Sequence, residues 1–268
     1  MQKLYTSKEA EHLDKEQESL ENYWTNIWDQ QALINDIKHT ILNRDEFKFI
    51  DPFLQRLVPN AKILDGGCGM GEWTLYYTQQ GFDVIGLDTS QKTLDRLTEK
   101  FPTVPFRHGD IRKTDFADNH FDAILSWGVF EHFEPGLSPC LQEAYRILKP
   151  GGLLCFTVPY QNLRHTLRVL SSKSRSRLTI QVELPHKDYL FYSWRFTQHE
   201  LKEECWFNGF KMHTIQPIHQ YTGIKRILQK DLGIKNTSTL YKPAIKILKF
   251  ILPDFYTSHM LLGIGFKT

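Results

Sequence analysis

The sequence predicts an α/β fold built on a doubly wound, mostly parallel sheet. Three observations favour it. Short apolar strands alternate with amphipathic helices between residues 61 and 158, which is typical of a parallel sheet with helices on both faces. A glycine-rich turn follows the first of these strands. Acidic residues end successive strands, at positions that right-handed crossovers bring to one edge of the sheet.

Local signals place each element of this alternating part. Gly81 ends the first helix, Ser90 caps the second, and Pro150 and Gly151 follow the third. The predicted strands cover 61–65, 83–88, 105–108, 121–126 and 153–158, and the predicted helices cover 72–80, 91–100 and 136–148. Further along, Thr197 and Glu200 form a capping box that opens another helix. The last two strands are predicted over 210–217 and 259–266.

The flanking segments are predicted to be helical. Thr6 with Glu9 fits a capping box, and one apolar stripe follows, made of Leu20, Trp24, Ile27 and Trp28. A second helix is expected over 33–43, and a third is expected to end near Val58. We therefore expect an N-terminal helical lid over 1–60. The main domain is expected over 61–268, with insertions at 159–196 and 218–258.

Composition excludes several classes of protein. The chain has 268 residues with a net charge of +2, which does not mark a dedicated nucleic-acid binder, so no nucleic-acid partner is expected. It has no apolar run long enough to span a membrane and no apolar signal core near the N-terminus. Four cysteines without a CxxC pair indicate free thiols. A cytoplasmic location is therefore expected.

The most informative stretch runs from Ile63 to Gly71. An acid, Asp65, ends the strand, and Gly67, Gly69 and Gly71 alternate after it. Glycine lets the backbone turn sharply and leaves no Cβ between main chain and ligand. A dinucleotide fingerprint would need a glycine at position 72, where Glu72 would oppose a pyrophosphate, so a nicotinamide-dependent dehydrogenase is disfavoured. A phosphate-binding P-loop is also excluded, because no Gly-Lys-Ser/Thr sequence follows these glycines. A ligand that carries an amine, which Asp65 could hold, fits better.

Two further acids end neighbouring strands. Asp88 ends the second strand, and its carboxylate can accept hydrogen bonds from both hydroxyls of a ribose. Asp110, in the turn Gly109-Asp110-Ile111 after the third strand, could accept from the exocyclic amine of adenine. Gly-Asp alone is a common turn. Three acids at successive strand ends indicate a nucleoside site.

These patterns resemble the class I S-adenosylmethionine-dependent methyltransferases, especially their small-molecule, type 11-like subgroup. The resemblance covers residues 61–158 and returns in 191–217. Residues 63–71 resemble the family's first motif, and Phe121–Trp127 resembles its fourth. The sequence LKPGG at 148–152 resembles the turn before the fifth strand, and Glu131-His132 resembles the Glu-His pair of the same subgroup.

The resemblance implies a Rossmann-like, seven-stranded sheet whose last strand is antiparallel, with S-adenosylmethionine as the cofactor. The residues it assigns to cofactor binding are Asp65, Gly66, Gly67, Gly69, Gly71, Asp88, Thr89, Asp110, Ile111, Ser126 and Trp127. An aromatic face such as that of Trp127 would favour a sulfonium cation, although core packing is the alternative explanation for this residue and for Trp24 and Trp28.

The chemistry needs alignment of the acceptor and removal of its proton. Orientation contributes about 7–11 kcal/mol to such reactions, and a general base contributes roughly 10²–10⁴-fold. His132 is the best candidate base and Glu131 a weaker one, with a loop-anchoring role as the alternative for both. Some family members bind a divalent metal, but Gly128 stands where a further acid would help, so no metal is predicted.

Basic residues dominate both insertions and suggest the acceptor. The first insertion carries Arg164, Arg168, Lys173, Arg175 and Arg177. In the second, Lys242, Lys246 and Lys249 lie opposite Ile245, Leu248 and Leu252, which is typical of a basic amphipathic helix that can contact an anionic membrane or simply face solvent. Residues 191–197 loosely resemble methyltransferases encoded with bacterial surface-polysaccharide enzymes.

We therefore expect methyl transfer to an oxygen or nitrogen of a small molecule, with an anionic or phosphorylated sugar or glycan precursor as the acceptor. An RNA or protein methyltransferase and a non-catalytic S-adenosylmethionine-binding protein are the alternatives. The sequence does not indicate an oligomeric state.

Overall fold

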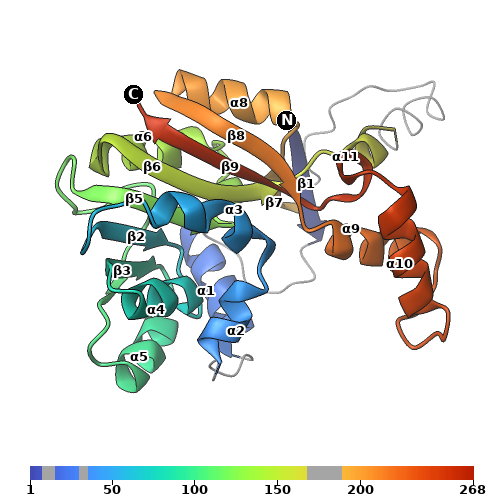
Figure 1. Cartoon of the computed structure of the whole chain (residues 1–268), viewed down its shortest axis with the longest axis horizontal. Helices are drawn as coiled ribbons and strands as arrows, with labels where there is room; N and C mark the ends of the chain where they lie inside the picture. The colour runs from blue at the N-terminus through green and yellow to red at the C-terminus, as the bar shows by residue number, and fades with distance from the viewer. Residues whose placement is uncertain (8–15, 30–35, 168–188) are drawn as a thin grey trace.

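The computed structural model describes residues 1–7, 16–29, 36–167 and 189–268 (Figure 1). At its centre is a seven-stranded sheet in the order β4-β3-β2-β5-β6-β9-β8. β9 runs antiparallel to both β6 and β8, and the other pairs are parallel. The predicted Rossmann-like fold with an antiparallel last strand is confirmed. The strands are β2 Lys62–Gly66, β3 Asp83–Asp88, β4 Phe106–His108, β5 Phe121–Trp127, β6 Leu148–Pro159, β8 Phe210–Ile218 and β9 Met260–Lys267.

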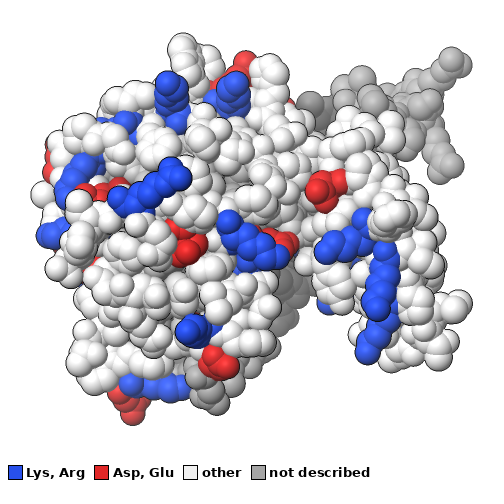
Figure 2. Space-filling view, viewed as in Figure 1, with Lys and Arg blue, Asp and Glu red and all other residues white. Residues whose placement is uncertain are grey.

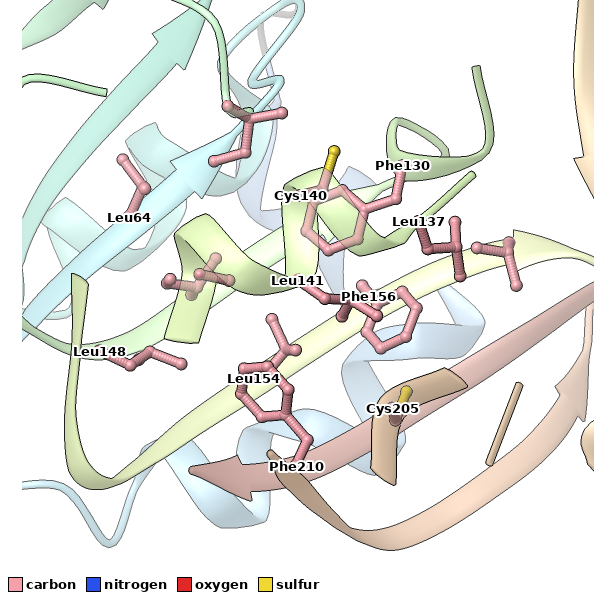
Figure 3. Packing of buried hydrophobic residues seen from close by; sticks show 14 of the residues in the cluster. Leu64, Phe130, Leu137, Cys140, Leu141, Leu148, Leu154, Phe156, Cys205 and Phe210 are labelled. Carbon is pink, nitrogen blue, oxygen red and sulfur yellow. The ribbon is translucent and has the colours of Figure 1, made fainter. Parts of the chain in front are cut away.

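Helices cover both faces of this sheet (Figure 1). On one face α2 (Ile37–Leu42), α3 (Asp45–Leu54) and α4 (Glu72–Gln79) pack against alternate strand residues such as Ile63. On the other face α6 (Ser138–Ile147) and α8 (Gln198–Phe207) pack against Leu64 and its neighbours (Figure 3). Because successive strand residues point to opposite faces, the apolar strands supply two cores at once.

The loops at the carboxyl ends of the strands hold the remaining short elements near the site. α5 (Gln91–Lys100) follows β3, and a turn of 3₁₀-helix at Phe130–His132 follows β5. The capping box predicted at the start of α8 is present, with Thr197 and Glu200 bonded reciprocally. All four cysteines are free and buried.

The N-terminus differs from the prediction. Residues Gln2–Ser7 form a strand, β1, which pairs antiparallel with β7 (Tyr189–Arg195) in a separate two-stranded sheet. The helix expected to start at Thr6 is therefore wrong at its beginning, while α1 covers Glu16–Asp29. A capping box is a local signal, and pairing with a strand nearly 200 residues away overrides it. Glu9 and residues 30–35 lie outside the described residues, and α3 ends at Leu54 rather than near Val58.

The second insertion forms a small helical lobe at the right of Figure 1. It contains α9 (Gln220–Arg226), a π-helical turn (Ile227–Asp231), α10 (Tyr241–Ile251) and α11 (Asp254–Thr257). Ile224, Leu228, Tyr241 and Ile245 form its own core. Gly223 lets α9 lie directly on the backbone before β9, since a Cβ there would be 1.5 Å from the Thr257 carbonyl oxygen. In the described ranges, no helix combines the length and apolar character needed to cross a membrane.

Candidate active site

A cavity of about 130 Å³ opens at the carboxyl edge of the sheet. This is the edge at which doubly wound sheets bind ligands. Loops after β2, β3, β4 and β5 supply most of its lining, and α1 contributes Trp24 and Trp28. The lining residues are Trp24, Trp28, Gly67, Asp88, Thr89, Gly109, Asp110, Ile111, Arg112, Trp127, Gly128, Val129, His132 and Phe133.

The glycine-rich loop takes its shape from left-handed backbone at three positions. Gly67, Gly69 and Gly71 have φ values of +78°, +49° and +71°, a region that side chains rarely adopt. A Cβ on Gly67 would be 2.3 Å from Val129 Cγ2, and one on Gly69 would be 2.8 Å from the Trp28 ring. Gly67 alone of the three lines the cavity. The glycines thus allow both the turn and the close approach of the neighbouring wall.

Asp65 lies beneath this loop rather than in the cavity wall. It is fully buried, and its Oδ2 accepts hydrogen bonds from the backbone N (3.1 Å) and Oγ1 (2.7 Å) of Thr74. Burial raises the pKa of Asp65 to about 7, although the bonds from Thr74 oppose the shift. Its Oδ1 is buried without a partner. In this structure Asp65 joins the end of β2 to α4.

Asp88 holds the glycine-rich loop and also faces the cavity. Its Oδ2 accepts from the Gly69 backbone N at 2.8 Å, and its Oδ1 accepts from the Ser90 N at 2.9 Å. Burial raises the pKa of Asp88, while these backbone bonds counteract the rise. Ser90 was predicted to cap α5, yet its side chain makes no capping bond, and its N–H donates to Asp88 instead. A carboxylate has about four acceptor positions, so Asp88 can still accept bonds from a ligand.

Asp110 is engaged by its neighbour. Arg112 donates its Nε and Nη2 to both carboxylate oxygens of Asp110 at 2.7–3.1 Å, and its guanidinium lies 4.3 Å from the centre of the Phe133 ring. Ile111 fills the space against Gly66, where a Cβ would be 2.8 Å from its Cδ1. The predicted acceptor for an amine is therefore at the cavity, held in a bidentate ion pair.

The indole rings of Trp24, Trp28 and Trp127 also line the cavity. Trp127, at the end of β5, lies 4.9 Å from Trp73, centroid to centroid. Trp24 and Trp28 of α1 stack at 5.8 Å. Ser126 is buried, donates to the Gly66 carbonyl at 2.8 Å, and so ties β5 to β2 without lining the cavity. The rings offer electron-rich faces to a cation.

His132 lines the cavity in a defined tautomer. Its Nδ1 is 2.8 Å from the Tyr192 carbonyl oxygen. A carbonyl only accepts, so Nδ1 carries the proton and Nε2 keeps a lone pair. Burial lowers the pKa of His132, against the opposing effect of the Tyr192 bond, and keeps the ring neutral at pH 7. Trp24 packs edge-on against it at 5.0 Å.

Glu131 is adjacent to His132 but outside the cavity wall. Only 2% of its surface is exposed, and this burial raises the pKa of Glu131 to about 8. Its Oε1 lies 3.9 Å from His132 Nε2, beyond hydrogen-bond distance. Among the described residues, no cluster of three His, Cys, Asp or Glu side chains could hold a metal ion.

The structure thus gathers part of the predicted site around one cavity. The predicted residues that line it are Gly67, Asp88, Thr89, Asp110, Ile111, Trp127 and His132. The predicted residues that do not line it are Asp65, Gly66, Gly69, Gly71, Ser126 and Glu131. Val129, Arg112 and Phe133 also line it and were not predicted. The one feature of the sequence that could have indicated these three residues as part of the site is that they lie close to Asp110 and Trp127 in the chain.

The sequence is similar to those of known methyltransferases. Residues 64–156 match the methyltransferase domain family. Demethylmenaquinone methyltransferase of Renibacterium salmoninarum is 38% identical over 98 residues, which are 36% of this chain and 40% of that protein. Malonyl-[acyl-carrier protein] O-methyltransferase of Salmonella typhimurium is 28% identical over 150 residues, 55% of this chain and 59% of that protein. The chain thus spans about half the length of these relatives.

A solved structure resembles the fold over almost the whole chain. Geranyl diphosphate C-methyltransferase of Streptomyces coelicolor, determined with Mg²⁺, geranyl diphosphate and S-adenosyl-L-homocysteine, superposes with a TM-score of 0.60 over 96% of this chain and 100% of that one. The two sequences are 15% identical. This likeness extends the shared architecture beyond residues 64–156.

Proposed function

We propose that this chain, whose residues 64–156 belong to the methyltransferase domain family, transfers the methyl group of S-adenosylmethionine to a small-molecule acceptor. The observation that carries the proposal is one cavity lined by both a carboxylate and indole rings. Asp88 can accept from hydroxyl or amine donors, and the rings of Trp24, Trp28 and Trp127 suit a sulfonium cation. This donor set fits the cofactor, which supplies an activated methyl group when bound.

The protein's own contribution is binding, exclusion of water and proton removal. Trp24 and Trp28 cover the cavity, and we propose that α1 is its lid. His132 presents a neutral ring with an unprotonated Nε2, the form in which histidine accepts a proton from an acceptor hydroxyl or amine. Glu131, with a pKa near 8, is protonated at pH 7 and suits a supporting role rather than that of a base.

Calorimetric titration with S-adenosylhomocysteine tests the cofactor assignment. Asp88→Asn keeps the shape of the side chain and removes its charge, so we expect affinity to fall by about tenfold or more, as for a lost charge-assisted hydrogen bond. Asp95→Asn on the exposed face of α5 is the matched control and should leave affinity unchanged. Absence of any binding heat with the unaltered protein would contradict the proposal.

We propose an anionic sugar or glycan precursor as the acceptor class, because of the basic insertions. Arg168, Lys173, Arg175 and Arg177 of the first insertion lie outside the described residues, whereas Arg164 is described and buried. RNA or protein methylation and cofactor binding without turnover are the alternatives. Methyl-transfer assays on sugar phosphates, tRNA and peptides, each with bound cofactor confirmed, separate these possibilities.

Peripheral contact with an anionic membrane is a second proposal, and an exposed stripe on α10 favours it. Ile245 and Leu248 pack into the lobe, as predicted for the apolar face. A second apolar stripe faces outward, where Ile247, Phe250 and Ile251 are 56%, 92% and 64% exposed. Exposed large apolar side chains beside lysines are typical of helices that lie in a membrane interface.

Charge supports an anionic membrane as the partner of this stripe. Residues 224–249 carry seven basic residues and one acid, Asp231, which pairs with Arg164. Basic side chains run along this lobe at the right of Figure 2. Co-sedimentation with vesicles tests the proposal. Phe250→Ser should reduce binding to phosphatidylglycerol vesicles, whereas Phe207→Ser, 76% exposed on α8, should not. Equal binding to neutral phosphatidylcholine vesicles, or no binding, would contradict it.

A further inference from the structure

Basic side chains from four separate segments lie near one another. We call them the arginine–histidine cluster: Arg164, His165, Arg195, Arg226 and His259. Arg164 and His165 follow β6, Arg195 ends β7, Arg226 ends α9, and His259 precedes β9. Both insertions therefore contribute to one place, although they are far apart in the sequence.

Contacts within the cluster bring like charges together. The His165 ring lies between two guanidinium groups, with Nε2 3.2 Å from Arg164 Nη2 and Nδ1 3.3 Å from Arg195 Nη1. A neutral imidazole has one acceptor nitrogen, so it cannot accept from both arginines at once. The ring therefore accepts from at most one of the two guanidinium groups, which lie on either side of it.

Arg164 supplies a donor that the described structure leaves unsatisfied. The residue is 91% buried, since only 9% of its surface is exposed, and its Nη1 pairs with Asp231 Oδ2 at 2.5 Å. Its Nε is buried and has no hydrogen-bond partner. Leaving a buried charged donor unpaired is costly, and guanidinium groups are suited to bidentate contact with phosphate.

Burial and positively charged neighbours lower the pKa values of both Arg226 and His259. Burial lowers the pKa of Arg226, and the charge of Arg164 lowers it further against the effect of Tyr192. The pKa of His259 falls to about 3 through burial and the charges of Arg226 and Arg195, with smaller effects of His219 and His165. Both Arg226 and His259 are only partly buried, so a ligand can reach them.

The cluster adjoins the candidate base through Tyr192. The Tyr192 carbonyl accepts from His132 Nδ1, and the two rings lie 5.3 Å apart. On the sheet, β6 is the parallel neighbour of β5, which carries Trp127 into the cavity. The chain beyond β6 then bonds to His259, whose carbonyl accepts from the Tyr160 N at 2.9 Å. Tyr192 thus contacts His132 and also lies near Arg226 of the cluster. An acceptor that lies against His132 and extends past Tyr192 would approach the cluster.

We propose that the arginine–histidine cluster binds a phosphate or diphosphate group of the methyl acceptor and so places its nucleophile beside His132. The proposal rests on the proposed methyl-transfer function. Gathering cations is unfavourable on its own, and such arrangements concentrate at functional sites. An anion with several oxygens would satisfy Arg164 Nε and relieve the repulsion among the arginines.

Inorganic pyrophosphate is the probe, titrated into the full chain by calorimetry. We expect binding to the unaltered protein, and about tenfold to 100-fold weaker binding to Arg226→Gln, as for loss of a hydrogen bond to a charged group. Lys230→Gln, an exposed change of the same charge in the adjoining π-helical turn, is the control and should bind normally. In ¹H–¹⁵N spectra the pKa of His259 should rise when pyrophosphate binds.

Binding of S-adenosylhomocysteine, measured on the same samples, separates the two proposals and shows that Arg226→Gln is folded. If S-adenosylhomocysteine binds but pyrophosphate does not, or if Arg226→Gln and Lys230→Gln bind pyrophosphate equally well, the cluster is not a phosphate site while the methyltransferase assignment stands. Malonate binding as tightly as pyrophosphate would overturn the choice of phosphate. Failure to bind S-adenosylhomocysteine would overturn both proposals.

Discussion

Replacing Gly67 by alanine separates backbone strain from crowding in the cavity wall. Gly67 has φ +78°, and left-handed backbone costs an alanine about 1–2 kcal/mol. The added Cβ would be 2.3 Å from Val129 Cγ2 and 3.1 Å from Val129 Cγ1. Overpacking of this kind costs about 1–3 kcal/mol. We therefore expect Gly67→Ala to lower the free energy of unfolding by about 2–5 kcal/mol.

Two comparison variants isolate the contributions. Gly81 has φ +90°, and a Cβ there would meet nothing within 4 Å, so Gly81→Ala should show the backbone cost alone. Val129→Ala removes both methyl groups that the new Cβ would meet. In the double variant the nearest remaining contact is Val129 Cβ at 3.3 Å, so most of the crowding is relieved, and we expect a coupling energy of about 1–3 kcal/mol between the two positions.

Urea denaturation of the five proteins measures these differences, and calorimetry measures their affinity for S-adenosylhomocysteine. Gly67 and Val129 both line the cavity, so Gly67→Ala should also weaken cofactor binding, whereas Gly81→Ala should not. The reasoning is refuted if Gly67→Ala and Gly81→Ala lose the same stability, or if the changes at 67 and 129 are additive.

Further predictions concern ionisable groups near the site and its supports. Burial raises the pKa of Glu131 to about 8, above its value in the unfolded chain, so the native state loses stability as the pH rises from about 4.5 to 8. Glu131→Gln should remove this loss in urea titrations at several pH values, and a pH-independent difference would argue against it. Burial lowers the pKa of His219, but the hydrogen bond and charge of Glu46 outweigh that effect and raise it. The pair's contribution should be complete between about pH 4.5, where Glu46 is ionised, and pH 6.5, and should decline as the pH rises through the folded pKa of His219, a slope that His219→Gln should abolish. His132→Gln should reduce methyl transfer by roughly 10²–10⁴-fold with S-adenosylhomocysteine affinity retained, and unchanged turnover would exclude it as the base.

Local patterns were enough to predict most of the sheet. Strand ends at Asp88 and Trp127, and the capping box at Thr197, depend on residues close together in the chain, and the structure places them within a residue or two of expectation. The alternation of strands and helices implies right-handed crossovers, and these place the carboxyl ends of the parallel strands at one edge of the sheet. The acids that end the strands were therefore expected at that edge. The predicted location of Asp88 and Asp110 at one cavity depended only on these rules.

Side-chain partners could not be predicted in the same way. Asp65 was expected to face a ligand, yet its carboxylate bonds to Thr74 beneath the loop. Asp110 was expected to accept from the exocyclic amine of adenine, yet Arg112, two residues on, donates to both of its carboxylate oxygens. Such outcomes depend on which rotamers fit the surrounding packing, and no pattern of residue types specifies them.

The amino-acid sequence by itself determined the alternating framework, the glycine turns and the row of acids, because hydrophobic periodicity and backbone preference act over a few residues. Only the tertiary structure decided that β1 pairs with β7, that α10 exposes Phe250, and that Arg226 lies near both Arg164 and His259. These features join segments far apart in the chain, and their formation depends on the packing of the whole fold rather than on any local preference.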